Sequence, residues 1–236
     1  MSLTGARGLL LKRGSSGVVG KQPKHPAKYT DKFIPIFAEL LQGCKNVLDP
    51  LSGVGKLALI QDYGYTGDVY LNELECEWAY QAQRRATITT VDAEYLPYRD
   101  AYFSAICVSP VYGNRYADHH DAKDSSRRVT YKHYLGRDLT AGNTGAMQWG
   151  PEYRQKHELI WAECYRVLQD GGIFILNISD HIRDGVVAPV TDWHIGFLTS
   201  IGLTVVEHRK IPTQRMRFGK NHKARVEHES IIVFQK

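Results

Sequence analysis

Apolar residues along the chain alternate between short continuous runs and sets spaced as on one face of a helix. The runs typical of buried strands lie at residues 46–48, 69–71, 87–91, 105–108 and 172–178. The helical sets lie at residues 33–41, 56–63, 75–85 and 151–168. Strands that alternate with helices predict an α/β fold, here a three-layer, doubly wound, mainly parallel sheet of about seven strands.

The C-terminal part of the chain breaks this alternation. A strand expected at residues 203–207 is followed by a basic loop and a final strand at residues 230–234. No helix is expected between these two strands, so the pattern predicts a hairpin whose last strand runs antiparallel to the rest. The glycine pair at residues 171–172 is expected to end the helix before it.

Length and composition limit the number of domains. A chain of 236 residues with 43% hydrophobic content can bury one core, so we expect a single domain over residues 25–236. Residues 1–24 form a basic arm without periodicity, expected to be loosely ordered. Four scattered cysteines and the lack of a long apolar run lead us to expect a soluble, cytoplasmic protein with reduced thiols and no membrane partner.

Charge is unevenly distributed along the chain. The formal net charge is +5, yet residues 1–30 carry six Lys or Arg and no acid. Residues 207–225 carry seven more against Glu207 alone. Segregated basic segments favour contact with a polyanion such as nucleic acid.

A glycine-containing loop, DPLSGVG at residues 49–55, follows the first predicted strand. Ligands of open parallel sheets bind beyond the carboxyl ends of the strands, where glycine lets the backbone approach closely. Glu73 ends the next strand, and its carboxylate can accept hydrogen bonds from both hydroxyls of a ribose. Asp92 follows the third strand and can accept one from the amino group of adenine. The three strand ends predict a nucleoside site.

A dinucleotide site is the alternative. Residues 53–58 read GVGKLA, which satisfies the G-x-G-x-x-A pattern, with Glu73 near the expected distance. Asp49, however, would place a carboxylate near the pyrophosphate and repel it. A ligand with a cationic amino group and no phosphate fits this acid better. A phosphate-binding P-loop is excluded, because Lys56 has neither the upstream glycine nor the following Ser or Thr.

Four motifs together resemble a known family. Beside the loop at 49–55 they are NELE at 72–75, VDA at 91–93 and SPVYG at 109–113. In this order they are similar to the motifs of class I S-adenosylmethionine-dependent methyltransferases, specifically those that methylate amino groups of DNA bases. The substrate loop of that group is usually written (Asp/Asn/Ser)-Pro-Pro-(Tyr/Phe). With HPAKY at 25–29 and the closing strand at 225–234, the resemblance covers most of residues 25–236 outside an insertion at 114–150.

The resemblance implies a seven-stranded sheet with an inserted antiparallel last strand, and S-adenosylmethionine as the cofactor. It implies that the cofactor lies over the two glycines of the 49–55 loop, its ribose on Glu73, its adenine on Asp92 and its methionine end near Asp49 and residues 25–29. The implied cofactor-binding residues are Lys28, Tyr29, Asp49, Pro50, Gly53, Gly55, Glu73, Asp92 and Ala93.

The loop at residues 109–113 indicates which group of the substrate would react. The amino group of a base is a poor nucleophile, because its lone pair is delocalised into the ring. Two acceptors aimed at its hydrogens can localise that lone pair toward the methyl donor. The resemblance assigns the catalytic roles to Ser109, Pro110 and Tyr112, with Tyr112 stacked on the base. Val111 replaces the usual second proline, which implies an altered pocket, another substrate or an inactive member.

The insertion mixes basic and aromatic side chains, which suit phosphate contact and base stacking. The candidate nucleic-acid contacts are Arg115, Arg127, Arg128, Lys132, Arg215 and Arg217. The expected partner is DNA, with RNA possible and a helper subunit for recognition conceivable. Residues 119–121, HHD, are expected to be surface residues, with no metal site. The open alternatives are an RNA base methyltransferase, a non-catalytic nucleic-acid-binding relative and, more remotely, a nicotinamide-dependent oxidoreductase.

Overall fold

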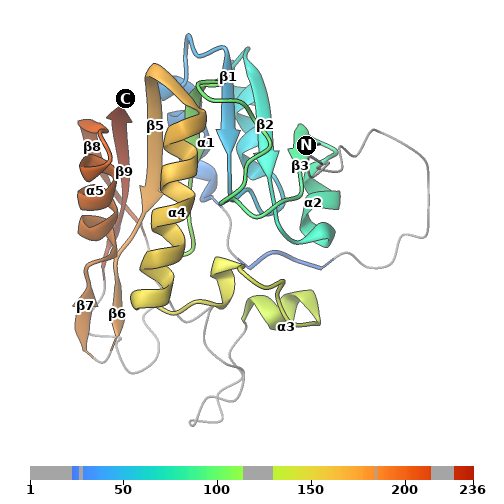
Figure 1. The fold of residues 1–236 in the computed structure, drawn as a ribbon, viewed down its shortest axis with the longest axis vertical. Helices are drawn as coiled ribbons and strands as arrows, with labels where there is room; N and C mark the ends of the chain where they lie inside the picture. The colour runs from blue at the N-terminus through green and yellow to red at the C-terminus, as the bar shows by residue number, and fades with distance from the viewer. Residues whose placement is uncertain (1–22, 27–28, 114–129, 184, 214–225) are drawn as a thin grey trace, which may run out of the picture.

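The computed structural model describes residues 23–26, 29–113, 130–183, 185–213 and 226–236. Seven strands form one sheet in the order β3-β2-β1-β4-β5-β9-β8 (Figure 1). They are β1 (Asn46–Asp49), β2 (Asp68–Asn72), β3 (Thr87–Thr89), β4 (Phe103–Val108), β5 (Leu168–Ile178), β8 (Thr204–Pro212) and β9 (His228–Gln235). Strand β9 is antiparallel to both of its neighbours, whereas β1 to β5 pair in parallel. The predicted sheet is confirmed.

Helices cover both faces of this sheet (Figure 1). They are η1 (Asp31–Phe33), α1 (Ile34–Leu40), η2 (Lys56–Tyr63), α2 (Cys76–Ala82), α3 (Tyr131–Leu135), η4 (Thr144–Ala146), α4 (Pro151–Val167) and α5 (Val190–Ser200). Side chains alternate along the strands: Val47 packs in the apolar layer of α1, η2 and α2, and Leu48 in that of α4 and α5. The predicted three layers therefore follow from the pleat of the buried strands.

The C-terminal half differs from the sequence prediction in two places. A helix, α5, lies between the strands at 168–178 and 204–212, where the sequence analysis predicted no element. Helix α4 ends at Val167, before the glycine pair, and Gly171 lies within β5 at a φ of +73°. A glycine at positive φ interrupts a strand as readily as it ends a helix, so the pair marked the wrong boundary.

The carboxyl ends of the parallel strands share one edge of the sheet. A two-stranded hairpin of β6 (His181–Arg183) and β7 (Val186–Ala188) directly follows β5 at this edge, and α3 lies beyond it too (Figure 1). Among the described residues, no helix combines the length and hydropathy needed to cross a bilayer. The fold thus brings the predicted motifs to the edge where open α/β sheets bind ligands.

Candidate functional site

A cavity of about 300 Å³ opens at the carboxyl edge of the sheet. The sequence-predicted residues that line it are Tyr29, Pro50, Gly53, Glu73, Asp92, Ala93, Ser109, Pro110 and Tyr112. Part of the insertion also lines it, through Tyr131, Gly142, Asn143 and Thr144. One cavity therefore joins the two predicted loops, and a wall of it comes from a segment that sequence reasoning assigned to nucleic acid.

The two glycines of the 49–55 loop have different roles. Gly53 lies on the cavity at a φ of +54°, where a Cβ would come within 3.0 Å of the His25 ring. Gly55, at +75°, does not line the cavity. Its missing Cβ would lie 2.8 Å from Leu71 Cδ1 and 2.9 Å from Ala82 Cβ. Gly53 therefore lets the His25 ring lie close to the loop at the cavity, while Gly55 lets the loop pack on β2 and α2.

We expect Gly55→Ala to lower the free energy of unfolding by about 2–4 kcal/mol, since it combines backbone strain with overpacking. Gly64→Ala is the matched control, because Gly64 has a φ of +89° and no atom within 4 Å of its Cβ position. It should cost about 1 kcal/mol from strain alone. Urea unfolding of both variants measures the difference, and equal costs would contradict the packing role.

Glu73 is held at the end of β2 by the backbone of both loops around it. Its Oε2 accepts a hydrogen bond from the Gly53 amide at 2.8 Å, and its Oε1 accepts one from the Glu75 amide at 2.9 Å. Burial raises the pKa of Glu73 to about 7. Each carboxylate oxygen can accept a second hydrogen bond. Glu73 is therefore oriented by the protein and keeps acceptor capacity for a ligand diol.

Asp49 lies behind the cavity and does not line it. Its carboxylate is fully buried, 3.1 Å from the Tyr29 hydroxyl and 3.2 Å from the Leu51 amide. Burial raises the pKa of Asp49 to about 7. Asp49 thus orients Tyr29 and the loop in this structure, and its contact with a ligand stays a prediction.

Asp92 is paired with a buried lysine that sequence reasoning missed. Lys156 Nζ lies 2.7 Å from Asp92 Oδ2 and 2.8 Å from Glu94 Oε1. A Cβ on Gly142 would lie 2.7 Å from the same Asp92 oxygen, so the insertion packs directly on this pair. The available signal was a charged residue on the apolar face of the helix at 151–167. Ala93 lies beside Asp92, buried on the cavity.

The substrate loop, residues 109–113, is compact. Ser109 Oγ lies 3.2 Å from the Tyr112 hydroxyl. The Gly113 carbonyl accepts a hydrogen bond from the Trp149 amide at 2.9 Å, and a Cβ on Gly113 would lie 2.5 Å from that nitrogen. The chain therefore leaves the core at Gly113 and returns to the same point at Trp149, which encloses most of the predicted insertion.

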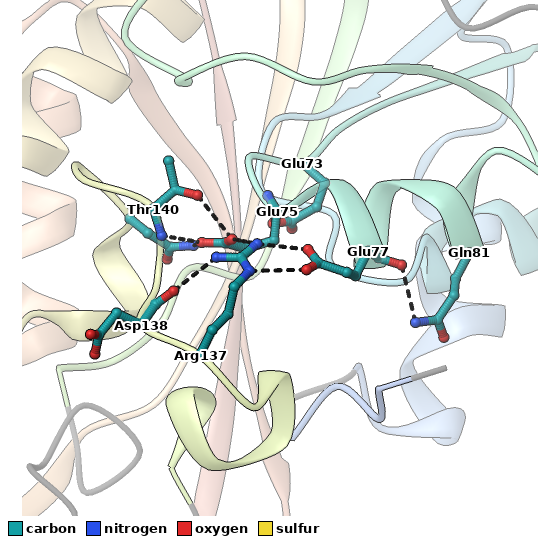
Figure 2. Close-up of polar contacts among 8 residues, drawn as sticks. Glu73, Glu75, Glu77, Gln81, Arg137, Asp138 and Thr140 are labelled. Carbon is teal, nitrogen blue, oxygen red and sulfur yellow. Dashed lines mark hydrogen bonds and ion pairs between the residues drawn. The ribbon is translucent and has the colours of Figure 1, made fainter. Parts of the chain in front are cut away.

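Glu75 anchors the described part of the insertion to α2 (Figure 2). Its carboxylate is fully buried and accepts hydrogen bonds from Thr140 N at 2.8 Å, Thr140 Oγ1 at 3.0 Å, Asn143 Nδ2 at 2.7 Å and Arg137 Nη2 at 2.7 Å. Arg137 also bonds Glu77, at 2.9 and 2.7 Å, and lies between the two acids in Figure 2. The guanidinium of Arg137, one of the basic side chains of the insertion, therefore bonds two acids of this protein.

Only one of the predicted nucleic-acid contacts lies among the described residues. Lys132 is exposed on α3, with its Nζ 2.5 Å from Asp138 Oδ1. The other predicted residues that lie outside the described ranges are Lys28, Arg115, Arg127, Arg128, Arg215, Arg217 and residues 119–121. Within the described ranges, no group of three or more His, Cys, Asp or Glu side chains is placed to hold a metal ion.

Comparison with known proteins shows the fold. No family model matches the sequence, and no curated protein matches it. An S-adenosylmethionine-dependent methyltransferase from Methanosarcina mazei is similar in structure, with a TM-score of 0.56, 14% identity and coverage of 86% of this chain and 97% of that one. The N-methyltransferase NodS from Bradyrhizobium japonicum is also similar, with a TM-score of 0.53, 14% identity and coverage of 86% of this chain and 92% of NodS.

The cyclase SpnF is similar to the same degree, with a TM-score of 0.57, 14% identity, and coverage of 87% of this chain and 81% of SpnF. The chain therefore has the Rossmann-like fold of class I methyltransferases. A shared fold does not fix a reaction, as the cyclase illustrates, so function has to be argued from the site.

Proposed function

We propose that this protein is an S-adenosylmethionine-dependent methyltransferase that acts on the exocyclic amino group of a nucleobase, in DNA. The observation that carries the proposal is the shared cavity. The strand-end acids Glu73 and Asp92 line the same cavity as Ser109 and Tyr112 of the loop at 109–113. A nucleoside cofactor and a flat amino-bearing substrate would meet there.

The charge of the cavity supports this cofactor over a dinucleotide. The acids Glu73, Asp92 and Glu229 line the cavity with one lysine, Lys56, and Lys156 pairs with Asp92. Above about pH 7, where Glu73 is ionised, the acids outnumber these lysines, which favours a ligand with ammonium and sulfonium groups over a pyrophosphate.

The residues present fit the parts of this cofactor. Glu73 would hold the ribose hydroxyls, and Asp92 with Ala93 would hold the adenine. Gly53 lines the cavity without a side chain. The cofactor would supply an electrophilic methyl group on sulfur: an N–C bond would form at the base as the S–C bond breaks, and one amino proton would be released to solvent.

The substrate loop supports the choice of an amino group as the acceptor. Ser109 Oγ and the Pro110 carbonyl can both accept hydrogen bonds from an –NH₂ group, which would draw its lone pair out of the ring. The remaining acceleration would come from orientation of donor and nucleophile in line. Tyr112, half-buried beside Ser109, offers a ring for stacking.

DNA is proposed as the substrate because of the basic segments at residues 1–30 and 207–225. A base in a duplex would have to be flipped into the cavity, at a cost of a few kcal/mol. The test is transfer of a labelled methyl group from S-adenosylmethionine to duplex DNA, single-stranded DNA and RNA in parallel. Label in DNA supports the proposal. Label only in RNA would replace the substrate, and no label in any polymer would refute the proposed activity.

We expect cofactor binding to weaken at acidic pH. The ionised Glu73 accepts both ribose hydrogens, whereas its protonated form has lost an acceptor site. Because its pKa is raised to about 7, affinity should fall by about tenfold between about pH 8 and about pH 6. Asp49, with a pKa also raised to about 7, titrates in the same range. Calorimetry across this range measures the effect, and Glu73→Gln should bind more weakly with a flatter profile. An unchanged slope in that variant would exclude Glu73 as the source.

A further inference from the structure

A buried chain of hydrogen bonds connects helices α4 and α5 to the backbone of the substrate loop. The Tyr153 hydroxyl lies 2.5 Å from the carbonyl oxygen of Val111 and 3.0 Å from His194 Nε2. His194 Nδ1 lies 2.8 Å from Trp161 Nε1. The Tyr153, Trp161 and His194 side chains are all fully buried. Because water does not compete at these contacts, they constrain geometry more strongly than surface hydrogen bonds do.

Chemistry fixes the direction of each hydrogen bond. An indole N–H can only donate, so His194 Nδ1 must accept from Trp161. Burial lowers the pKa of His194 well below its usual value, so its ring is neutral and carries its single proton on Nε2. Nε2 therefore donates to the Tyr153 oxygen. The Tyr153 proton is left for the Val111 carbonyl, which can only accept.

The ring that carries this hydroxyl is itself fixed. The Tyr153 ring stacks on that of His157, with centroids 4.0 Å apart and planes at 30°. His157 Nδ1 lies 2.8 Å from the backbone carbonyl of Tyr153, one helical turn earlier. The Trp149 ring also packs against the Tyr153 ring, with centroids 5.3 Å apart. The hydroxyl of Tyr153 therefore has little freedom to leave Val111.

The hydrogen-bond chain acts on Val111, the position where the loop has no second proline. Pro110 has a fixed φ, and Gly113 is bonded to Trp149, whereas Val111 between them has no ring to fix its φ. We propose that Tyr153 is a positioning residue for methyl transfer: its hydroxyl, oriented by His194 and Trp161, holds the Val111 carbonyl and so fixes the Pro110 carbonyl and Ser109 against the base. This inference rests on the proposed function, which it deepens.

Tyr153→Phe tests the proposal, because it removes one hydroxyl and keeps the ring. We expect kcat for nucleic-acid methylation to fall between about tenfold and about a hundredfold, as small misplacements of reacting groups do. The dissociation constant of S-adenosylmethionine should stay within about twofold, because no cofactor-binding residue is touched. Tyr165→Phe, in the same helix, removes a hydroxyl away from the loop and should change neither value. An unchanged kcat in Tyr153→Phe would overturn the proposal.

Two further readouts separate this proposal from the proposed function. Nitrogen NMR of the wild-type protein should find His194 protonated at Nε2 only, and protonation at Nδ1 would overturn the chain. Amide hydrogen exchange at Tyr112 and Gly113 should be faster in Tyr153→Phe than in Tyr165→Phe. Equal exchange would overturn the positioning role even if the wild type is active. If amide exchange is faster in Tyr153→Phe but the wild-type protein methylates no nucleic acid, only the proposed function is refuted.

Discussion

Glu75→Ala is expected to lower the free energy of unfolding by about 3–5 kcal/mol, the largest stability effect among the substitutions considered. The Glu75 carboxylate is fully buried and accepts four hydrogen bonds from Arg137, Thr140 and Asn143. Its removal leaves these donors without their partner, and buried unsatisfied donors are costly. Urea unfolding measures the loss.

The same substitution should weaken cofactor binding. Asn143 and Thr144 line the cavity, and Glu75 holds the segment that carries them. Glu77→Ala is the matched control: Glu77 bonds the same arginine from an exposed position and should cost less than about 1 kcal/mol. Similar losses of unfolding free energy in both variants would show that the Glu75 contacts stabilise the protein no more than a surface ion pair does.

Ser109→Ala is expected to lower kcat for methyl transfer by about a hundredfold or more. Its hydroxyl oxygen is one of the two acceptors proposed to localise the lone pair of the amino group, and loss of one such polar group in a site typically costs this much. Single-turnover assays with labelled cofactor and DNA measure the rate. The dissociation constant of the cofactor should be unchanged, because the assigned cofactor contacts, Glu73 and Asp92, follow β2 and β3, whereas Ser109 follows β4.

Tyr112 provides the companion test. Tyr112→Phe keeps the ring and loses the 3.2 Å contact with Ser109 Oγ, so it should reduce kcat less than Tyr112→Ala does. Methyl incorporation that neither Ser109→Ala nor Tyr112→Ala reduces would refute the catalytic assignment of the loop.

The sheet and its strand-end acids could be predicted because they obey local rules. Buried parallel strands appear as continuous apolar runs, and an acid that ends such a strand must lie at the ligand edge. Glu73 and Asp92 were found in this way. Gly53 and Gly55 look alike in sequence, however, and only the packing of Gly55 on Leu71 and Ala82 separates their roles.

Helix α5 was missed because its buried face is partly polar. The buried residues are Val190, Thr191, His194 and Leu198, which have helical spacing but not an apolar pattern. His194 is buried there because it completes the hydrogen-bond chain to Val111 through Tyr153. A polar residue that the core satisfies cannot be distinguished from a surface residue by periodicity alone.

The insertion wall of the cavity could not be predicted for a different reason. Thr140 and Glu75 are 65 positions apart, and nothing in either local sequence specifies the contact. Lys156 likewise meets Asp92 only because α4 packs beside the loop after β3. Pairings of this kind depend on tertiary structure, so sequence reasoning assigned the basic residues of the insertion to nucleic acid as a group.

Identification of the methylated nucleoside decides whether this protein transfers a methyl group to the amino group of a DNA base. DNA would be incubated with S-adenosylmethionine carrying a deuterated methyl group, digested to nucleosides, and separated by chromatography before mass spectrometry. We predict a label on an exocyclic amino group, as N4-methylcytosine or N6-methyladenine. Label recovered as 5-methylcytosine, or no labelled nucleoside from either DNA or RNA, would contradict it.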